Sequence, residues 1–459
     1  MMSRFSAKQL ITSPVQLLKP VAVAVWIGII ALCILLIGEM ENIPCCTIVS
    51  DCVRDIGLYG SIVFSGCTLF YFLVQALLAV FYRPAADLER EKLPAVTVII
   101  PAYNEGKQIA DTIESVLQAD YPAEKLEIIA INDGSGDDTW KWIRSTAEKH
   151  PGSITAINLE KNGGKKHALC TGISRARGEI AVTIDSDSEI VKDALLKIVC
   201  PFSDPKVGAV AGNVRVMNLK DGCIPKMLDT AFAFGFEFMR AAQSRIHSVL
   251  CTPGALSAYR IAAVKPLLTW WLNQTFLGRP ATIGEDRAIT SMLIRQGWYS
   301  DFQSNAFVFT RMPVTYSGVF KMLTRWCRSD IRENIIMLKF AFFDLRHFRF
   351  RRLGLQLNVL FASISIILPL FSIPALFLAI LSVPLEACLL LATGNVLWST
   401  VPAFIYASRY GIRNSCWALV YGFYYLPFLS WIGIYSVITI RNNSWITRQL
   451  PLADSKKSE

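Results

Sequence analysis

The chain has 459 residues, of which 53% are hydrophobic, and a formal net charge of +10. This length allows one or two globular cores plus several membrane spans, and the apolar fraction is high for a purely soluble enzyme. The basic charge suits nucleic acid, anionic lipid or phosphorylated substrates. Because the sequence holds no zinc-ligand spacing and no RNA-binding signature, nucleic acid is the weakest of these partners.

Two apolar runs of spanning length lie near the N-terminus, at 21–38 and 62–82. The loop between the two runs is acidic and is predicted to lie outside the membrane. Lys and Arg occur before the first run and after the second, so both of these segments are predicted to lie on the cytoplasmic side. Cys45, Cys46 and Cys52 cluster in the loop, which leaves a disulfide there open. We interpret the first run as a retained anchor rather than a signal peptide.

Residues 93–311 have the pattern of an α/β domain. Apolar, β-branched runs predict buried strands at 96–100, 128–131, 154–159, 180–184 and 207–211. Segments of helical length at 110–119, 139–148 and 191–199 lie between them. This alternation predicts a doubly wound, mostly parallel sheet, which binds ligands at the carboxyl ends of its strands.

The C-terminal part is predicted to lie at and in a membrane. At 319–334, apolar residues recur at helical spacing opposite a stripe formed by Lys321, Arg325, Arg328 and Arg332, as in an interfacial amphipathic helix. Residues 353–440 are strongly apolar, are broken by four prolines and could form three or four spans. We favour four, hence six in total, with the loop after Arg409 outside.

Three polar clusters follow predicted strands. Residues 100–105 read IPAYNE, 131–135 read INDGS and 162–167 read NGGKKH. The first could place an aromatic ring and a carboxylate at the sheet edge or cap a helix. The second could bind a base or ribose or form an ordinary turn. In the third, glycines permit close approach of a phosphate and Lys165 supplies charge, although the spacing is not that of a Walker loop.

Three further clusters contain residues suited to metal binding, to acid–base catalysis and to binding of phosphate or sugar. Asp185 and Asp187 end a buried strand, where two carboxylates favour a hard divalent cation completed by substrate phosphates over a surface turn. Asp286, in the run GEDR, either serves as a general base or sits at a helix start. Arg325 and Trp326 suit phosphate and a sugar ring, or anchoring at an interface.

In order and spacing these motifs resemble the family 2 inverting glycosyltransferases, specifically the membrane synthases of hyaluronan, chitin oligosaccharides, poly-N-acetylglucosamine and cellulose. The resemblance runs from about residue 93 to 448 and rests on PAYNE, INDGS, GGKKHAL, DSDS, NQTFLGRPATIGEDR, TRW and WITR. It implies a GT-A (Rossmann-like) catalytic domain inserted between transmembrane helices. The stretch 273–287 is most similar to hyaluronan synthases and nodulation-type chitin oligosaccharide synthases.

The resemblance also implies roles for matching residues. Asp286 would be the general base, supported by Glu285 and Arg287. The nucleotide sugar would be held by Tyr103, Glu105, Asp133, Lys165, Asp185, Arg325, Trp326 and Arg448. The acceptor would meet Thr252, Gly254 and Trp326, and Asp187 with Asp185 would bind Mg2+ or Mn2+. One departure is Met322, where the family has Gln three residues before Arg325; another is Asn132 beside Asp133.

The resemblance thus implies a processive inverting enzyme that polymerises a UDP-sugar into a β-linked polysaccharide and exports it. UDP-N-acetylglucosamine is the first choice of donor, with UDP-glucuronate as a co-substrate for hyaluronan. Transfer of one sugar to a lipid carrier and a catalytically silent scaffold remain alternatives. We expect the growing polysaccharide and membrane lipids as partners, and a multi-pass protein with a cytoplasmic catalytic domain. The expected parts are an N-terminal tail with two spans (1–83), the catalytic domain (84–311), amphipathic interface helices (312–352), C-terminal spans (353–440) and a cytoplasmic tail (441–459).

Overall fold

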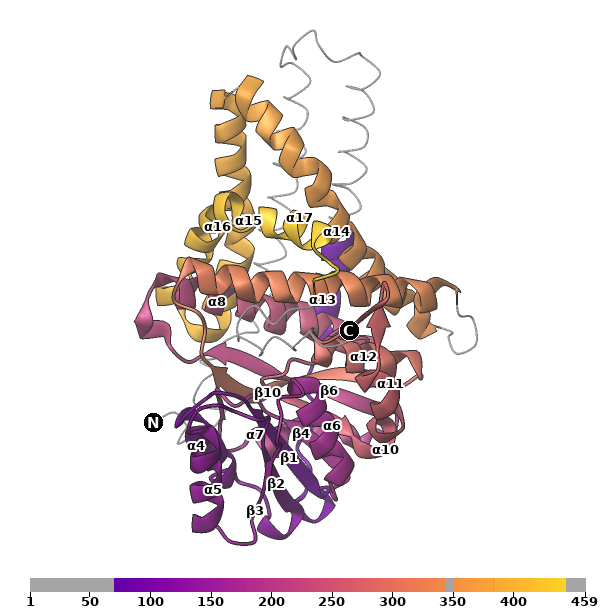
Figure 1. Cartoon of the computed structure of the whole chain (residues 1–459). Helices are drawn as coiled ribbons and strands as arrows, with labels where there is room; N and C mark the ends of the chain where they lie inside the picture. The colour runs from indigo at the N-terminus through magenta and orange to yellow at the C-terminus, as the bar shows by residue number, and fades with distance from the viewer. Residues whose placement is uncertain (1–69, 344–349, 383, 443–459) are drawn as a thin grey trace, which may run out of the picture.

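The computed structural model describes residues 70–343, 350–382 and 384–442. A sheet domain lies below and a set of long helices rises above it, with α13 (Tyr316–Phe343) lying across the top of the sheet domain between them (Figure 1). The predicted span at 21–38, the loop with Cys45, Cys46 and Cys52, and Arg448 lie outside the described residues.

The core of the lower domain is an eight-stranded, mostly parallel sheet in the order β3-β2-β1-β4-β7-β6-β10-β5. Only β7 and β5 run antiparallel to their neighbours. The strands are β1 (Val96–Ala102), β2 (Leu126–Asn132), β3 (Ile154–Asn158), β4 (Ile180–Thr183), β5 (Ser188–Ile190), β6 (Val207–Val216), β7 (Ser257–Arg260) and β10 (Tyr299–Thr310). A separate two-stranded hairpin pairs β8 (Thr275–Phe276) with β9 (Arg279–Pro280).

Helices cover both faces of this sheet, which explains why its strands read as continuous apolar runs. In β1, Val98 and Ile100 face one cluster together with Ile109 and Ile113 of α4, whereas Ile99 faces the other with Leu169 of α6. Successive side chains of a strand point to opposite faces, so every position of β1 is buried. Each large aliphatic side chain buried in this way contributes about 1.5–3 kcal/mol of transfer free energy.

The helices alternate with the strands along the chain. In the sheet domain they are α4 (Gln108–Leu117), α5 (Thr139–Lys149), α6 (Lys165–Arg175), α7 (Ala194–Ile198), α8 (Cys223–Phe234), α9 (Ala241–Arg245), α10 (Ile261–Val264), α11 (Leu268–Leu272) and α12 (Glu285–Arg295). A π-helix, η6 (Gly235–Arg240), joins α8 to α9. Above α13 follow α14 (Phe350–Ser382), α15 (Pro384–Tyr410), α16 (Trp417–Phe428) and α17 (Trp431–Ile438).

The five predicted strands are confirmed as β1, β2, β3, β4 and β6, with ends shifted by a few residues. The predicted helix at 191–199 begins only at Ala194, because β5 ends just before Val191 and pairs with β10. Strands β5, β7 and β10 were not predicted: β5 and β7 are too short to show a period, and β10 mixes polar with apolar residues.

The strand order reverses direction at β1, because β2 and β4 lie on its two sides and β1 pairs parallel with both. Doubly wound sheets bind ligands in the crevice at such a switch point, outside the carboxyl ends of the strands. Tyr103 follows the end of β1 and Asp185 follows β4, so both lie at this edge. The predicted position of the binding site follows directly from the topology.

The upper helices fit insertion into a membrane. Among the described residues, Ala387–Tyr410 is long and apolar enough to cross a bilayer, and Ile412–Phe428 with Trp431–Ile438 form a second candidate that is bent by 46°. The C-terminal end of α15 returns to the sheet domain, where Arg409 lies 3.7 Å from Glu237. Our placement of the Arg409 loop on the side opposite the catalytic domain was therefore wrong.

The basic stripe predicted on α13 is only partly exposed. Lys321 faces outward, but the side chains of Arg328 and Arg332 are buried, with 2% and 3% of their residue surfaces exposed. Arg328 donates to Thr439 Oγ1 and Arg332 donates to the carbonyl of Ile283. Helical spacing predicted one basic face, but the part of it with Arg328 and Arg332 packs against protein rather than water.

Candidate active site

A pocket of about 470 Å³ opens at the carboxyl edge of the sheet, beneath α13. It is bounded by the ends of β1 and β4, the start of α6, helix α8 with the π-helix, the start of α12 and the inner face of α13. Among the predicted residues, it is lined by Tyr103, Asp133, Lys165, Asp185, Asp187, Gly254, Glu285, Asp286, Arg287, Arg325 and Trp326. Residues from motifs spread over more than two hundred positions thus meet in one cavity.

One end of the pocket has the polar groups expected for a nucleoside. Asp133 Oδ1 accepts a hydrogen bond from the Gly163 amide at 2.9 Å, which ties the motif after β2 to the glycine loop. Burial raises the pKa of Asp133 above its ordinary value. Glu105 is not among the lining residues; its Oε1 accepts from Ser186 Oγ at 2.9 Å and so supports the loop between the two aspartates.

Lys165 stands at the centre of a charge cluster. Its Nζ lies 2.5 Å from Asp185 Oδ1 and 2.8 Å from Glu285 Oε1. Burial alone lowers the pKa of Lys165, but the surrounding carboxylates outweigh it and raise the pKa above its usual range. Lys165 is therefore a permanent positive charge. A Cβ at Gly254 would lie 2.5 Å from Nζ, so a larger residue there would displace the Lys165 ammonium from this position.

Asp286 lies in the first turn of α12, directly after Glu285. Its Oδ1 accepts from the Arg287 amide at 2.8 Å and its Oδ2 from the Gly254 amide at 3.2 Å. Burial, followed by the negative charge of Glu285, raises the pKa of Asp286 to about 6. For Glu285, burial opposes ionisation but Lys165 outweighs it and lowers the pKa to about 2. Two adjacent acids with pKa values moved apart are the arrangement found in acid–base sites.

The turn before α12 fits only a glycine. Gly284 has φ of +69°, in the left-handed region, and a Cβ built on it would overlap Ser329 Oγ of α13. Arg332 of α13 also donates to the carbonyl of Ile283 at 2.5 Å. The start of α12, and with it Asp286, is therefore held against α13.

The two aspartates after β4 suit a hard divalent cation. Both line the pocket, and Asp187 Oδ1 accepts from Ser188 Oγ at 3.3 Å and Thr310 Oγ1 at 3.4 Å. In the described part of the chain, no three or more His, Cys, Asp or Glu side chains form a closed ligand set. Mg2+ is commonly held by one or two carboxylates together with substrate phosphates. The donor chemistry of Asp185 and Asp187 fits an ion of that kind, shared with a bound diphosphate.

One wall of the pocket is aromatic and basic, and the sequence analysis missed most of it. Trp326 of α13 faces Phe232 of α8 with ring centroids 6.1 Å apart. The guanidinium of Arg240 lies 3.9 Å from the Phe236 ring centroid, and its Nε donates to the Cys251 carbonyl at 3.2 Å. Phe232, Phe236 and Arg240 belong to no recognised motif, and the aromatic run FAFGFEF at 232–238 was the only local signal for them.

The other predicted residues have mixed outcomes. Thr252 does not line the pocket: it is fully buried, at 0% exposure, and its hydroxyl bonds Tyr259 and Thr290, so its contact with an acceptor stays a prediction. Its neighbour Gly254 does line the pocket. Arg287 lies beside Asp330 at 3.2 Å.

Met322, the departure from the family pattern, touches the pocket with an apolar side chain. It is buried in a cluster of apolar residues contributed by α8, α13 and the C-terminal helices: Leu228, Val319, Met322, Leu429 and Ile432. An amide at this position would have an apolar environment. Met322 therefore joins the packing between the pocket wall and the upper helices.

A mostly parallel sheet with paired aspartates at its edge, a buried lysine and a neighbouring pair of acids fits a nucleotide-sugar-dependent hexosyltransferase with a GT-A-like fold. Comparison with known proteins agrees. The profile of the family described as "Glycosyltransferase like family 2" matches residues 94–329, and the chain belongs to this family. A mannosyltransferase from Pyrobaculum calidifontis, solved with GDP-Man and Mn2+, shares the fold with a TM-score of 0.57 and 24% identity, covering 75% of this chain and 94% of that one.

Similar full-length relatives include an N-acetylglucosaminyltransferase of Rhizobium meliloti (strain 1021). It is 28% identical over 380 residues, which are 82% of this chain and 87% of the relative. A hyaluronan synthase of Streptococcus pyogenes is 28% identical over 404 residues, covering 86% of this chain and 91% of the relative. Both matches extend well beyond the residues of the family profile and into the upper helices.

Proposed function

We propose that this protein is a processive inverting glycosyltransferase that polymerises a UDP-sugar into a β-linked polysaccharide and exports it across a membrane. The observation that carries the proposal is Asp286, a half-buried carboxyl with a raised pKa, within one pocket with Lys165 and the Asp185/Asp187 pair. UDP-N-acetylglucosamine is the preferred donor, because relatives named N-acetylglucosaminyltransferase and hyaluronan synthase align over most of the chain.

The proposed reaction is a single displacement. Asp286 accepts the proton of the acceptor hydroxyl while that oxygen attacks the anomeric carbon of the donor. The bond from this carbon to the diphosphate oxygen breaks, and its electron pair leaves with UDP. Because attack and departure occur on opposite faces of the sugar, the anomeric configuration inverts. A carboxyl with a pKa of about 6 is mostly ionised at neutral pH, as a base must be, yet basic enough to hold the proton.

Cationic groups of the pocket would stabilise the negative charge that develops on the leaving diphosphate. Lys165 is held by two carboxylates and needs little reorganisation to face a third anion, and Arg325 adds a second cation to the pocket lining. Asp187 and Asp185 would hold Mg2+ or Mn2+, which would neutralise further charge on the leaving diphosphate. Tyr103 and Asp133 would bind the uracil and ribose, with Glu105 acting through Ser186.

The acceptor end of the polymer would lie against the aromatic wall. Trp326 and Phe232 both line the pocket and supply aromatic rings of the kind on which sugars stack, and Gly254 leaves room beside Asp286. This wall adjoins α13 and the upper helices, so a lengthening chain that leaves the pocket on this side moves towards them. Arg448, outside the described residues, is proposed to reach the nucleotide.

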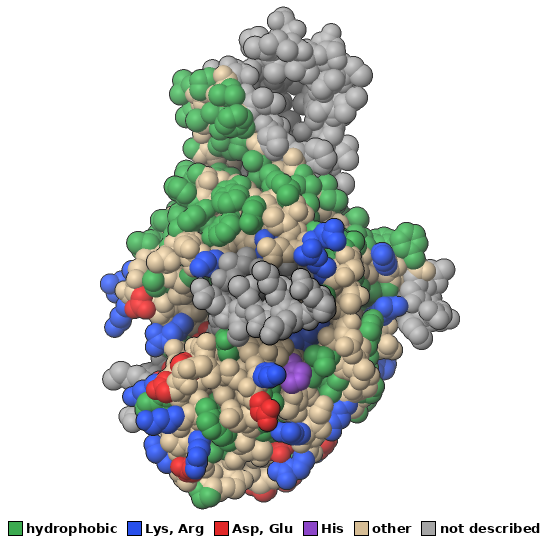
Figure 2. All heavy atoms as spheres, viewed as in Figure 1, with side chains coloured by type: hydrophobic (Ala, Val, Ile, Leu, Met, Phe, Trp, Pro, Cys, Tyr) green, Lys and Arg blue, Asp and Glu red, His purple; other side chains and the backbone are tan. Residues whose placement is uncertain are grey.

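A membrane location is supported by the surface of the upper helices. Hydrophobic side chains cover this part, while Lys and Arg gather below it (Figure 2). Large hydrophobic residues exposed here include Leu353, Phe377, Leu381, Leu385, Leu389, Phe423 and Phe428. Soluble monomers rarely expose so large an apolar area. We propose a multi-pass protein with a cytoplasmic catalytic domain and keep the expected division into 1–83, 84–311, 312–352, 353–440 and 441–459.

The test is incorporation of label from each UDP-sugar, alone and in pairs, by purified protein in a membrane mimetic with Mg2+ or Mn2+. Polymer from UDP-N-acetylglucosamine alone identifies a chitin-like or poly-N-acetylglucosamine synthase. Polymer that requires UDP-glucuronate as well identifies a hyaluronan synthase. Single-sugar products on a lipid carrier, or UDP binding without transfer, would overturn the processive proposal.

A further inference from the structure

The helix formed by α8 and the π-helix contacts different parts of the protein on two faces. One face lines the pocket with Ala231, Phe232, Gly235, Phe236 and Arg240. The other face carries two buried acids, Asp229 and Glu237, that do not line the pocket. A π-helix costs regular hydrogen bonding and is frequent at functional sites. Within it, Phe236 lines the pocket and the adjacent Glu237 does not.

The buried acids are held from below by strand β6. Arg215 donates to both carboxylate oxygens of Asp229, from Nε at 2.9 Å and from Nη2 at 2.6 Å. Asn213 Nδ2 donates to Glu237 Oε1 at 2.5 Å. These bonds fix one side of the helix to the sheet.

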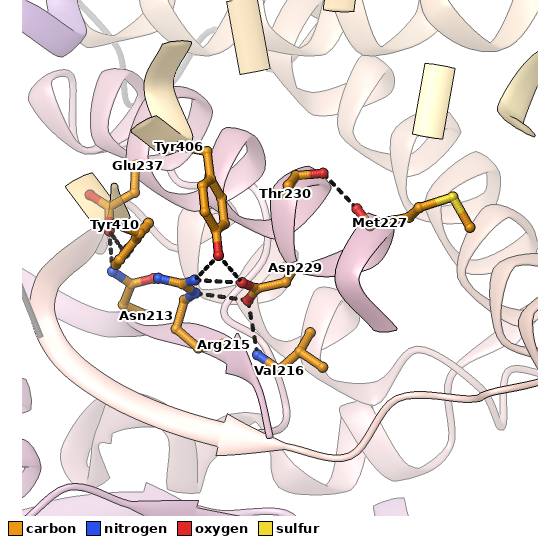
Figure 3. A network of polar contacts seen from close by, with 9 residues as sticks. All are labelled: Asn213, Arg215, Val216, Met227, Asp229, Thr230, Glu237, Tyr406 and Tyr410. Carbon is orange, nitrogen blue, oxygen red and sulfur yellow. Dashed lines mark hydrogen bonds and ion pairs between the residues drawn. The ribbon is translucent and has the colours of Figure 1, made fainter. Parts of the chain in front are cut away.

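The same acids are held from above by the last two turns of α15. Tyr406 donates its hydroxyl to Asp229 Oδ2 at 2.9 Å, and Tyr410 donates to Glu237 Oε1 at 2.6 Å. Both hydroxyls point towards the carboxylates from the helix above them (Figure 3). The Arg215 guanidinium also lies 3.4 Å from the centroid of the Tyr410 ring. Thus α15 meets the pocket-lining helix through polar groups rather than through apolar packing alone.

The charges in this network balance. Arg215 and Arg409 supply two positive charges, and Asp229 and Glu237 supply two negative ones. Asp229 is 1% exposed, so its carboxylate depends on these partners in place of water. Networks of this kind rigidify what they join and specify one arrangement, because each unmet bond is costly in a low-dielectric interior. The pocket wall and α15 are therefore oriented relative to each other.

We infer that Tyr406 and Tyr410 are positioning residues for the acceptor: they fix the wall of Phe232, Phe236 and Arg240 from the apolar helix α15. This inference rests on the proposed function. The affinity for the acceptor then depends on α15. The affinity for the donor does not, because the donor half of the pocket is built on β1 and β4. Product length then depends on two hydroxyls that touch neither substrate.

The experiment compares the wild type with the double variant Tyr406→Phe/Tyr410→Phe in a membrane mimetic. Phenylalanine keeps both rings, including the one stacked on Arg215, and removes only the two hydroxyls. The matched control is Tyr425→Phe, because Tyr425 lies on α16 with an exposed side chain and outside the network. The readouts are Tm, KM for UDP-N-acetylglucosamine, KM for an N-acetylglucosamine oligomer as acceptor, and product length.

We expect the double variant to raise the acceptor KM about tenfold, because part of the free energy of the two lost hydrogen bonds to carboxylates reaches the pocket wall, and to shorten the product. The donor KM and the control should stay at wild-type values. A wild-type acceptor KM and product length in the double variant would overturn the inference. Equal rises in both KM values with a lower Tm would also overturn it, by showing a general structural role. A wild type that transfers no sugar would instead defeat the proposed function, which separates the two failures.

Discussion

Replacing Asp286 with Asn should separate chemistry from binding and from folding. Asn has nearly the same shape, and its amide oxygen can still accept from the Gly254 or Arg287 amide, but it cannot take up a proton. Loss of a general base typically lowers the rate by about 10²–10⁴-fold. UDP binding should persist, because Tyr103, Asp133 and Lys165 are unchanged.

The same substitution should stabilise the fold. The pKa of Asp286 is raised from 3.8 to about 6, so the folded state binds its proton more tightly than the unfolded state does. Stability therefore falls as the pH rises from below 4 to above 6, and the full penalty is present at pH 7.5. A shift of about two units at 1.36 kcal/mol each sets a ceiling of ~3 kcal/mol, and relaxation around a half-buried group reduces it. We expect a gain on the order of 1–2 kcal/mol, with a higher Tm.

The assay measures transfer rate, UDP affinity by calorimetry and Tm on one preparation. Asp111→Asn is the control, because it makes the same chemical change on an exposed position of α4. Loss of transfer with intact UDP affinity and a raised Tm supports the reasoning. Retained transfer would refute Asp286 as the base, and a lowered Tm would refute the electrostatic argument.

Four further outcomes are expected. In the wild type, kcat/KM should fall tenfold per pH unit below about pH 6, where Asp286 is protonated, and be level above it in a pH–rate profile. Chelation of divalent ions should stop transfer in the wild type, and Asp187→Asn should weaken Mn2+ binding measured by calorimetry; transfer unaffected by chelator would exclude the metal. Met322→Gln should cost ~1–3 kcal/mol in thermal unfolding by burying an amide, whereas Met322→Leu should be nearly neutral. Gly284→Ala should abolish transfer because its Cβ overlaps Ser329, while Gly278→Ala, also left-handed but in open space, should cost only ~1–2 kcal/mol and retain activity.

The sequence determined the catalytic half of this protein. Strands buried on both faces read as unbroken apolar runs, so β1, β2 and β4 could be located from local pattern alone. Parallel strands with helical crossovers bring their carboxyl ends to one edge, and this rule places Asp133 and Asp185 together without knowledge of any contact. Lys165 and Asp286 were singled out from local polar clusters and assigned roles by the resemblance, and both line the same pocket.

Only the tertiary structure decided which helix faces meet. The arginines of α13 share one face by helical periodicity, yet Arg328 and Arg332 are buried because that face packs on other elements. Thr252 and Gly254 are two residues apart. The Thr252 side chain is buried against Thr290, whereas the Gly254 amide donates to Asp286 in the pocket. The contact between Arg409 and Glu237 joins segments far apart in the chain. Local sequence specifies the period of an element and its buried face, but the partner of that face is chosen by packing over the whole chain.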